Sequence, residues 1–428
     1  MIVQFSFSNF KSFKDKTALC FVAPKGTQKY YTHSYRRGNN IFKVAAVYGA
    51  NASGKSKLFE AFKFMRSVVV PPKKGGKIPM LDYWQTKYDA FKLNTYSVED
   101  NSFFEVVAII EKTQYRYGFE LNNSEFVSEW LFVEGDVEEN VFMRDNQKIS
   151  YKSKYISPAI ADNIINANMV SPDASFLVIL QTFNDSLAKK VVKWFEDVKV
   201  ISANNIGASM PISALTQNDP KRSIVAFLKS FDINIEDITP HEMNVDEIPE
   251  KIKAMIGEDE LKGNVYDGIR AAHKRYNKRY ERVDDIWFSL EKDESYGTNR
   301  LLSLSWPIIK SLKEGYVIFI DEFDSGIHPI IARFIIELFY REEFSSQLII
   351  NTQNTSLLNS KTSNNKKLFG KDQIFLVYKN RYGESSLTSL SEYGLNLHDN
   401  LEKLYMEGDF GAIPYIVMDR MNDILQNK

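Results

Sequence analysis

The stretch VYGANASGKSKLFEAF, residues 47–62, places a glycine and then a Gly-Lys-Ser triplet directly in front of an amphipathic run. It satisfies the pattern G-x-x-x-x-G-K-[ST], and the segment FKVAAVYG, residues 42–49, precedes it as a buried strand would. The residues behind it repeat with a period of about 3.6, which puts one apolar face on a helix: Leu58, Phe59, Phe62, Met65 and Val69. Strand, glycine loop and helix in this order predict a phosphate-binding P-loop.

Each residue type in this loop has a physical reason. Gly49 and Gly54 allow backbone angles that turn successive N–H groups inward, and the helix start adds a positive dipole end. We expect the Lys55 ammonium on the β- and γ-phosphates and the Ser56 hydroxyl on Mg²⁺. A chance glycine-rich turn is the alternative. The predicted nucleotide-binding residues of the loop are Gly49, Asn51, Ser53, Gly54, Lys55, Ser56 and Lys57.

A second segment, VIFIDEF at residues 317–323, supplies four apolar residues and then two carboxylates. In a parallel sheet the carboxyl ends of the strands bind ligands, so Asp321 is expected to hold Mg²⁺ through water and Glu322 to polarise the attacking water. Alone, this pattern reads as a plain strand end followed by a solvated turn. Together with the P-loop it predicts a Walker B strand.

The rest of the chain indicates a mixed α/β fold. Runs within residues 2–10 and 103–144 alternate as antiparallel strands do, whereas residues 156–262 are more helical and show no sustained heptads. Strand, helix and strand follow one another after residue 317, which implies parallel α/β structure. We expect an N-terminal lobe with the P-loop and a β meander, a mostly helical insertion ending in a basic hairpin, and a C-terminal lobe, over residues 1–150, 151–290 and 291–428.

The composition of the chain limits the classes of function that it can have. The 428 residues are 44% hydrophobic, enough for a sizeable core in one large or two intergrown domains. The 54 basic and 55 acidic residues give a net charge of −1, so any contact with a polyanion must be local. The single cysteine, Cys20, lies in the run ALCFVA and is expected to be a buried core thiol. With no signal-peptide pattern and no apolar run of about 18 residues, we expect a cytoplasmic protein without membrane contact.

Residues 270–282 form a local basic segment in which Tyr276 and Tyr280 are interleaved with six cations. The segment is consistent with tracking a nucleic-acid backbone, with aromatic stacking. It is equally consistent with a solvated hairpin that joins two strands. The cations are Arg270, Lys274, Arg275, Lys278, Arg279 and Arg282.

The order of motifs resembles the ABC-type ATPase head shared by SMC and DNA-repair ATPases: P-loop, long insertion, a Ser-x-Gly-Thr turn with a helix, Walker B, D-loop, and a strand with a polar end. More narrowly, four stretches resemble bacterial AAA/ABC-type ATPases of phage-defence and abortive-infection systems, of the AbiLi/RloA, Septu and PARIS types. These stretches are FSNFKSFKD (7–15), ESYGT (294–298), DEFDSGIHP (321–329) and LEKLYMEGDFGAIP (401–414).

The resemblance implies an ABC-type head that uses ATP and Mg²⁺ and sandwiches ATP between subunits in a head-to-tail dimer or higher homo-oligomer. It further implies that Ser295, Gly297 and Thr298 cap the γ-phosphate bound by the neighbouring P-loop, although the same turn could simply cap its own helix. Gln353 stands where relatives commonly carry a switch histidine, so it is a catalytic candidate with Lys55 and Glu322, and hydrolysis is expected to be slow.

Two further positions are open. His328 in GIHP resembles a D-loop residue, with a structural and a ligand role equally consistent. Gln85 is a candidate for the Q-loop, although a loop residue unrelated to the nucleotide is the favoured interpretation. The expected function is an ATPase that acts as sensor or scaffold of an antiviral system with a separate effector, a nuclease or toxin. The alternatives are an SMC-like ATPase that binds DNA directly and a non-hydrolysing scaffold.

Overall fold

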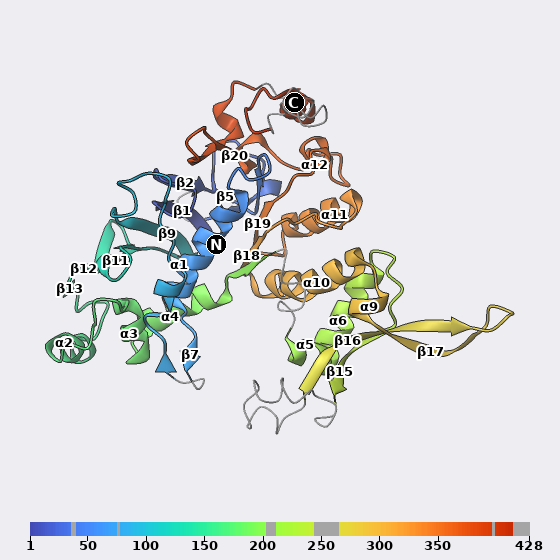
Figure 1. Ribbon diagram of the computed structural model, residues 1–428, viewed down its shortest axis with the longest axis horizontal. Coiled ribbons are helices and arrows are strands. Elements are labelled where there is room, and N and C mark those ends of the chain that lie inside the picture. Colours follow the sequence, from blue (N-terminus) through green and yellow to red (C-terminus); the bar gives the residue numbers. More distant parts are fainter. Residues whose placement is uncertain (36–39, 75–77, 203–210, 244–264, 396–398, 414–428) are drawn as a thin grey trace, which may run out of the picture. The chain divides into compact units, whose positions relative to one another are not determined.

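The computed structural model describes the chain except residues 36–39, 75–77, 203–210, 244–264, 396–398 and 414–428. Its contacts divide the chain into two compact units. Figure 1 shows the chain coloured from the N-terminus to the C-terminus. The first unit comprises Met1–Val200, Gly315–Phe323 and Arg333–Lys428; the second comprises Ile201–Glu314 and Asp324–Ala332. The three segments expected from the sequence remain a prediction, and residues 203–210 and 244–264 of the expected insertion lie outside the described part.

The first unit contains a seven-stranded sheet in which every neighbouring pair is antiparallel. Side chains along β9 alternate between buried and half-buried, because successive residues of a strand face opposite sides. The meander expected from the sequence is therefore present. In order across the sheet, the strands are β13 (Lys148–Tyr151), β12 (Glu138–Asp145), β11 (Phe126–Glu134), β10 (Thr113–Leu121), β9 (Ser102–Ile110), β1 (Ile2–Ser8) and β2 (Thr17–Cys20).

Cys20 corrects one prediction. It was expected in the core, but its side chain is exposed. The strand β2 lies at the edge of the sheet and alternates, so Leu19 and Phe21 are buried while Cys20 faces outward. An unbroken apolar run of sequence cannot distinguish a strand buried on both faces from an edge strand buried on one.

A six-stranded sheet carries the P-loop strand at its centre. The order is β14 (Lys199–Ile201), β18 (Val317–Ile320), β19 (Gln347–Asn351), β6 (Val44–Tyr48), β20 (Ile374–Lys379) and β21 (Ser385–Ser389). β6 pairs in parallel with β19 and β20, and β19 pairs in parallel with β18. All five residues of β6 are buried, as in a parallel strand covered on both faces. The predicted α/β class with an antiparallel subdomain is confirmed.

Helix α1 (Lys55–Val69) follows the P-loop, and its apolar side is buried in the core of the first unit. Phe62 stacks on Phe319 of β18, with ring centroids 4.6 Å apart. The other α-helices and strands among the described residues of this unit are α2 (Pro158–Asn166), α3 (Phe176–Thr182), α4 (Ser186–Asp197), α12 (Ser356–Asn359), α13 (Leu401–Glu407), β3 (Val22–Ala23), β4 (Thr32–Ser34), β5 (Asn40–Phe42), β7 (Lys73–Lys74) and β8 (Ile78–Pro79).

The buried carboxylate of Glu129, on β11, ties α3 to the seven-stranded sheet. It accepts hydrogen bonds from Ser175 Oγ (2.8 Å), from the backbone N–H of Phe176 (2.7 Å) and from Tyr117 Oη (3.0 Å). Burial, and then the Glu129 charge, raise the pKa of Tyr117 well above its ordinary value. These contacts anchor the first turn of α3 by satisfying N–H groups that have no partner within the helix.

The second unit has a three-stranded antiparallel sheet in which β16 (Val265–Tyr276) lies between β15 (Asp237–Met243) and β17 (Arg282–Ser289). The helices among its described residues are α5 (Ile212–Thr216), α6 (Asn218–Lys229), α9 (Leu290–Asp293) and α10 (Tyr296–Glu314); α11 (Pro329–Tyr340) runs from this unit into the first. α10, with 19 residues, is the longest described helix, so the described part has no long coiled coil. Within that part, no helix is long and apolar enough to cross a bilayer.

Candidate functional site

The loop of residues 49–54 joins the carboxyl end of β6 to the start of α1, and both of its motif glycines are required by close approach. Gly54 has φ of 119°, and a Cβ there would lie 2.5 Å from Ser385 Oγ. Gly49 has φ of 155°, and a Cβ there would lie 2.2 Å from the Val377 carbonyl oxygen. Any larger residue would therefore push the loop off the strands β20 and β21.

Lys55 and Ser56 begin α1 and face the ends of the parallel strands. The buried Lys55 ammonium donates to the carbonyl oxygens of Gly49 (2.6 Å) and Ala50 (2.8 Å). Ser56 Oγ donates to Asp321 Oδ1 across 3.0 Å, although the two residues are 265 positions apart. The structure thus brings together the hydroxyl and the carboxylate that the sequence assigns to one Mg²⁺ ion.

Asn351, at the end of β19, is a site residue that sequence reasoning missed. Its Nδ2 donates to Asp321 Oδ1, and its Oδ1 accepts from the backbone N–H of Glu322 at 2.5 Å. The side chain is buried, and Glu322 has a left-handed backbone with φ of 47°. Asn351 therefore holds the Asp321 carboxylate and the backbone of Glu322 in place. Its only signal in the sequence is a polar residue at the end of a second apolar strand.

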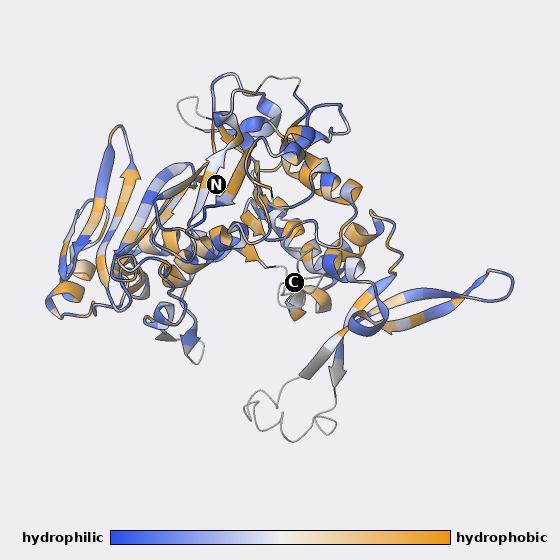
Figure 2. Ribbon diagram, turned by 45° about the horizontal axis from the view of Figure 1, so that its top comes forward, coloured by the Kyte–Doolittle hydropathy of each residue, from blue (hydrophilic) through white to orange (hydrophobic). Residues whose placement is uncertain are grey.

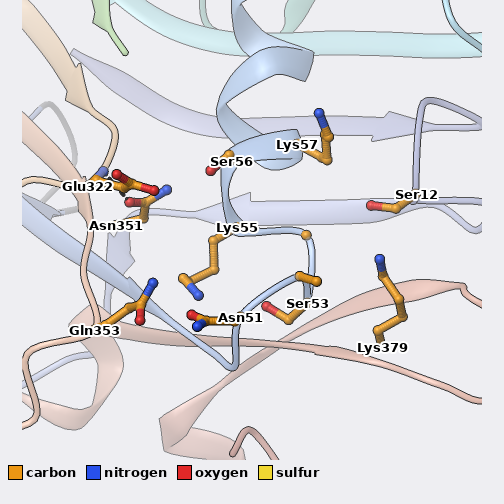
Figure 3. Close-up of a pocket in the computed structure, with 12 residues that line it drawn as sticks. Ser12, Asn51, Ser53, Lys55, Ser56, Lys57, Glu322, Asn351, Gln353 and Lys379 are labelled. Atoms are coloured by element: carbon orange, nitrogen blue, oxygen red, sulfur yellow. Dashed lines mark hydrogen bonds between the residues drawn. The ribbon is translucent and has the colours of Figure 1, made fainter. Parts of the chain in front are cut away.

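These residues line a cavity of about 550 Å³. Figure 3 shows Glu322, Asn351 and Gln353 on one side of the P-loop and Ser12 and Lys379 on the other. The predicted residues at the cavity are Asn51, Ser53, Gly54, Lys55, Ser56, Lys57, Glu322 and Gln353; Ala52 and the unpredicted Ser12, Asn351 and Lys379 also line it. Gly49 supports the loop from behind, and Asp321 reaches the site through Ser56.

Ser12 and Ser385 support the P-loop from two distant parts of the chain. Ser385 Oγ donates to the Ser53 carbonyl oxygen at 2.6 Å and lies 2.9 Å from Ser12 Oγ. The backbone N–H of Ser385 donates to the Ser12 carbonyl oxygen at 2.7 Å. One stretch that carried the family resemblance, FSNFKSFKD, therefore contacts the P-loop through Ser12.

The C-terminal stretch of the resemblance also packs beside the loop. Tyr405 of α13 meets Tyr48 edge to face, with ring centroids 5.8 Å apart. Burial raises the pKa of Tyr405, and a backbone hydrogen bond with Gly49 offsets part of that rise. Pro414, the last residue of the stretch, lies outside the described residues.

The predicted signature turn lies in the second unit. Ser295 Oγ accepts from the backbone N–H of Thr298 at 3.1 Å, so the helix-capping alternative is realised in α10. A Cβ on Gly297 would lie 2.7 Å from the Gly326 carbonyl oxygen, and Tyr296 Oη lies 3.1 Å from Ser325 Oγ. The signature turn thus packs closely on the D-loop turn. A role at the γ-phosphate of a neighbour remains a prediction.

The two open positions have structural contacts. His328 Nδ1 accepts from the backbone N–H of Ile330 at 3.2 Å, at the start of α11. Gln85 donates to the Ser124 carbonyl oxygen at 2.8 Å and is not among the residues that line the cavity. The structure therefore gives no support for Gln85 as a Q-loop residue.

The residues at the cavity fit a magnesium nucleotide. Ser53 Oγ is buried and has no hydrogen-bond partner, which leaves one polar atom of the loop for a phosphate oxygen. The Ser56 hydroxyl and the Asp321 carboxylate are hard oxygen ligands. No group of three or more His, Cys, Asp or Glu side chains suited to a metal occurs in the described part of the chain. Mg²⁺ needs none, because phosphates and waters complete its shell.

A P-loop on a central parallel strand, with its serine bonded to a Walker B aspartate, defines an ATPase of the AAA/ABC type. Residues 44–359 match the family described as "AAA domain, putative AbiEii toxin, Type IV TA system". The match spans well over half of the chain, and the chain belongs to this family. None of the curated proteins compared with the chain matches it.

Among solved structures, the chain is similar to SMC head domains. The head from Thermotoga maritima is 12% identical, with a TM-score of 0.40, over 91% of this chain and 98% of that chain. A head bound to the C-winged helix domain of ScpA is 15% identical, with a TM-score of 0.44, over 93% and 98%. A head with an extended coiled coil, bound to the C-terminal domain of ScpA derived from Pyrococcus furiosus, is 14% identical, with a TM-score of 0.39. The match covers 91% of this chain and 97% of that chain.

Proposed function

We propose that the protein binds ATP·Mg²⁺ in this cavity and hydrolyses it slowly. The observation that carries the proposal is the bond between Ser56 and Asp321, with Glu322 and Lys55 lining the same cavity. Lys55 exchanges its loop carbonyls for the β- and γ-phosphates, while Ser56 and Asp321 hold the metal. When bound, Mg²⁺ neutralises charge on the phosphates.

Glu322 and Gln353 face the γ-phosphate end of the cavity. Glu322 polarises the attacking water, and Asn351 fixes the backbone from which it projects. Gln353 donates a hydrogen bond to phosphate but carries no proton, so turnover is slow. Replacing Glu322 by glutamine keeps the shape and removes the base, so the variant holds ATP without turnover.

Calorimetry with the parent and with Lys55→Ala tests the nucleotide site. Loss of the ammonium should abolish measurable ATP binding, because it is the cation that the proposal places on the β- and γ-phosphates. Lys361→Ala, which removes an exposed lysine outside the cavity, is the matched control. If Lys55→Ala binds ATP as tightly as the parent, the P-loop assignment is wrong.

We also propose that hydrolysis requires two subunits. Support comes from the exposed Ser295 at the start of α10, where helix N–H groups suit a neighbour's γ-phosphate. Ser295→Arg and Lys55→Ala should each be inactive alone. Mixing them should restore part of the ATPase activity, since one hybrid site combines an intact P-loop with an intact signature turn. Full activity of Ser295→Arg alone would contradict the composite site.

In the cell, we propose a sensor or scaffold role in an antiviral system with a separate nuclease or toxin. The family description, which names the AbiEii toxin and a type IV toxin–antitoxin system, supports a defence context. Co-expression with the product of the adjacent reading frame, followed by phage challenge of the parent and of Glu322→Gln, tests it. Equal plating of phage on cells with and without the pair would contradict the antiviral role.

A second candidate function, direct nucleic-acid binding, is favoured by the tip of the β16–β17 hairpin. Arg275 pairs with Asp284 and Arg282 pairs with Asp285, which leaves those cations neutralised along the strands. Lys278, Arg279 and Tyr280 lie exposed at the tip, and the Tyr280 side chain is 88% exposed. Figure 2 shows polar and apolar residues mixed along the hairpin. Cations beside an exposed ring suit a single-stranded backbone with stacked bases.

A double variant, Lys278→Ser with Arg279→Ser, tests this candidate by gel shift with single-stranded DNA and RNA. Binding should weaken, and the dependence of log affinity on log salt should flatten by about 0.7 for each phosphate that the variant no longer neutralises. The matched control, Arg275→Ser with Asp284→Ser, removes an ion pair on the strands and no net charge. If the parent protein binds neither single-stranded DNA nor RNA, the hairpin is a solvated connection between two strands and this candidate function is wrong.

A further inference from the structure

The hairpin formed by β20 and β21 holds the P-loop at both of its glycines. The Val377 carbonyl oxygen on β20 occupies the space beside Gly49, and Ser385 on β21 occupies the space beside Gly54. Ser385 also bonds to the Ser53 carbonyl oxygen. Residues of this hairpin therefore keep a fixed place relative to the phosphate-binding loop.

Lys379 is the last residue of β20, two positions after Val377, and lies opposite Ser385 in the hairpin. It lines the same cavity as the P-loop. Figure 3 places it at the end that also holds Ser12, across the loop from Glu322 and Gln353. Glu322 and Gln353 mark the γ-phosphate end, so Lys379 lies at the end that would face the rest of the nucleotide.

The charges around the cavity single out this lysine. The proposed site assigns Lys55 to the β- and γ-phosphates, and Lys57 pairs with Glu60 at 2.9 Å. Lys379 is exposed and has no carboxylate partner among the described residues. An unpaired cation at the far end of a phosphate-binding loop suits the phosphate that lies farthest from the γ position.

We propose that Lys379 binds the α-phosphate of the nucleotide, an inference that rests on the proposed ATP site. The hairpin sets the position of the lysine, and the P-loop sets the position of the phosphate chain. Lys379 is thus a binding residue for the phosphate that hydrolysis leaves on the product. ATP and ADP share this contact, whereas inorganic phosphate and adenosine lack it.

Calorimetric titration of ATP, ADP and adenosine into the parent, Lys379→Ala, Lys379→Arg and Lys361→Ala tests the inference. Lys379→Ala should weaken the binding of ATP and the binding of ADP by the same factor, on the order of tenfold, as expected for the loss of one charge-assisted contact. The loss should shrink as salt rises, because the side chain is exposed. Lys379→Arg should retain most of the affinity, and Lys361→Ala all of it.

Each other outcome overturns the inference. A loss for ATP without a loss for ADP would place Lys379 at the γ-phosphate, and an equal loss for adenosine would place it at the base or ribose. Unchanged binding by Lys379→Ala, with binding abolished in Lys55→Ala, would remove Lys379 from the site and leave the ATP site standing. A parent that binds neither ATP nor ADP would overturn the proposed function itself. Equal thermal unfolding of the variants excludes a folding defect.

Discussion

Replacing Asn351 by aspartate changes the donor that holds Asp321 into a carboxylate and keeps the size of the side chain. The backbone N–H of Glu322 still finds an acceptor, because an aspartate oxygen takes the place of Asn351 Oδ1. The substitution thus isolates one hydrogen bond and adds one charge at a buried position.

The magnitude follows from those two changes. A hydrogen bond to a charged group contributes about 1.5–3 kcal/mol. Two carboxylates about 4 Å apart repel by up to about 4 kcal/mol at an effective dielectric constant of about 20, and one of them relieves this by taking up a proton. We expect Asn351→Asp to lower the free energy of unfolding by about 3–5 kcal/mol at neutral pH.

Urea unfolding followed by circular dichroism measures this loss, in EDTA and with Mg²⁺. The loss should shrink as the pH falls, since the shared proton is then bound in the folded state, and Mg²⁺ should restore part of the stability by pairing with both carboxylates. Gln353→Glu is the matched control, because it adds the same charge two residues along on an exposed side chain of the cavity. An Asn351→Asp protein as stable as Gln353→Glu would refute the role given to Asn351.

Three further outcomes follow from the described contacts. Glu129→Gln places an amide against two buried hydroxyls and two N–H donors, so thermal unfolding should show a loss of about 2–4 kcal/mol in the free energy of unfolding. The exposed Glu138→Gln should show little loss. Burial and then the charge of Lys43 lower the pKa of His33. As the pH falls, the unfolded chain therefore protonates this histidine before the folded chain does, so the free energy of unfolding should fall as the pH drops through about 6.5. A His33→Gln variant whose stability falls with pH as steeply as that of the parent would contradict this. Gln353→His should speed ATP hydrolysis or make it titrate; equal rates from about pH 5.5 to 8.5 would mean that residue 353 does not sense the γ-phosphate.

The parts of the site that lie in one continuous motif could be predicted from the sequence. The P-loop needs glycine, lysine and serine at fixed spacing, so Gly54, Lys55 and Ser56 are recognisable before any tertiary contact is known. The apolar run before Asp321 likewise predicts a buried strand, and β18 is buried throughout. The parallel class of the sheet followed from the alternation of strands and helices.

The parts that depend on strand adjacency could not be predicted. Asn351 reaches Asp321 only because β19 lies between β18 and β6, and the spacing along the chain does not specify that order. Ser385 and Lys379 reach the P-loop because the strand next to β6 on its other side is β20. The exposed Cys20 has the same cause, since only the sheet order makes β2 an edge strand.

The flanking of β6 by two later strands has a consequence for synthesis on the ribosome. The P-loop is translated early, but Ser385, which bonds to its Ser53 carbonyl oxygen, is 332 residues further on. At about 5–20 residues per second, that interval lasts roughly 15–65 seconds. The nascent chain therefore exposes an apolar central strand, with neither neighbour yet made, for most of its translation. We expect the emerging chain to depend on chaperones that shield apolar segments, and to acquire nucleotide only after its final hairpin has left the ribosome.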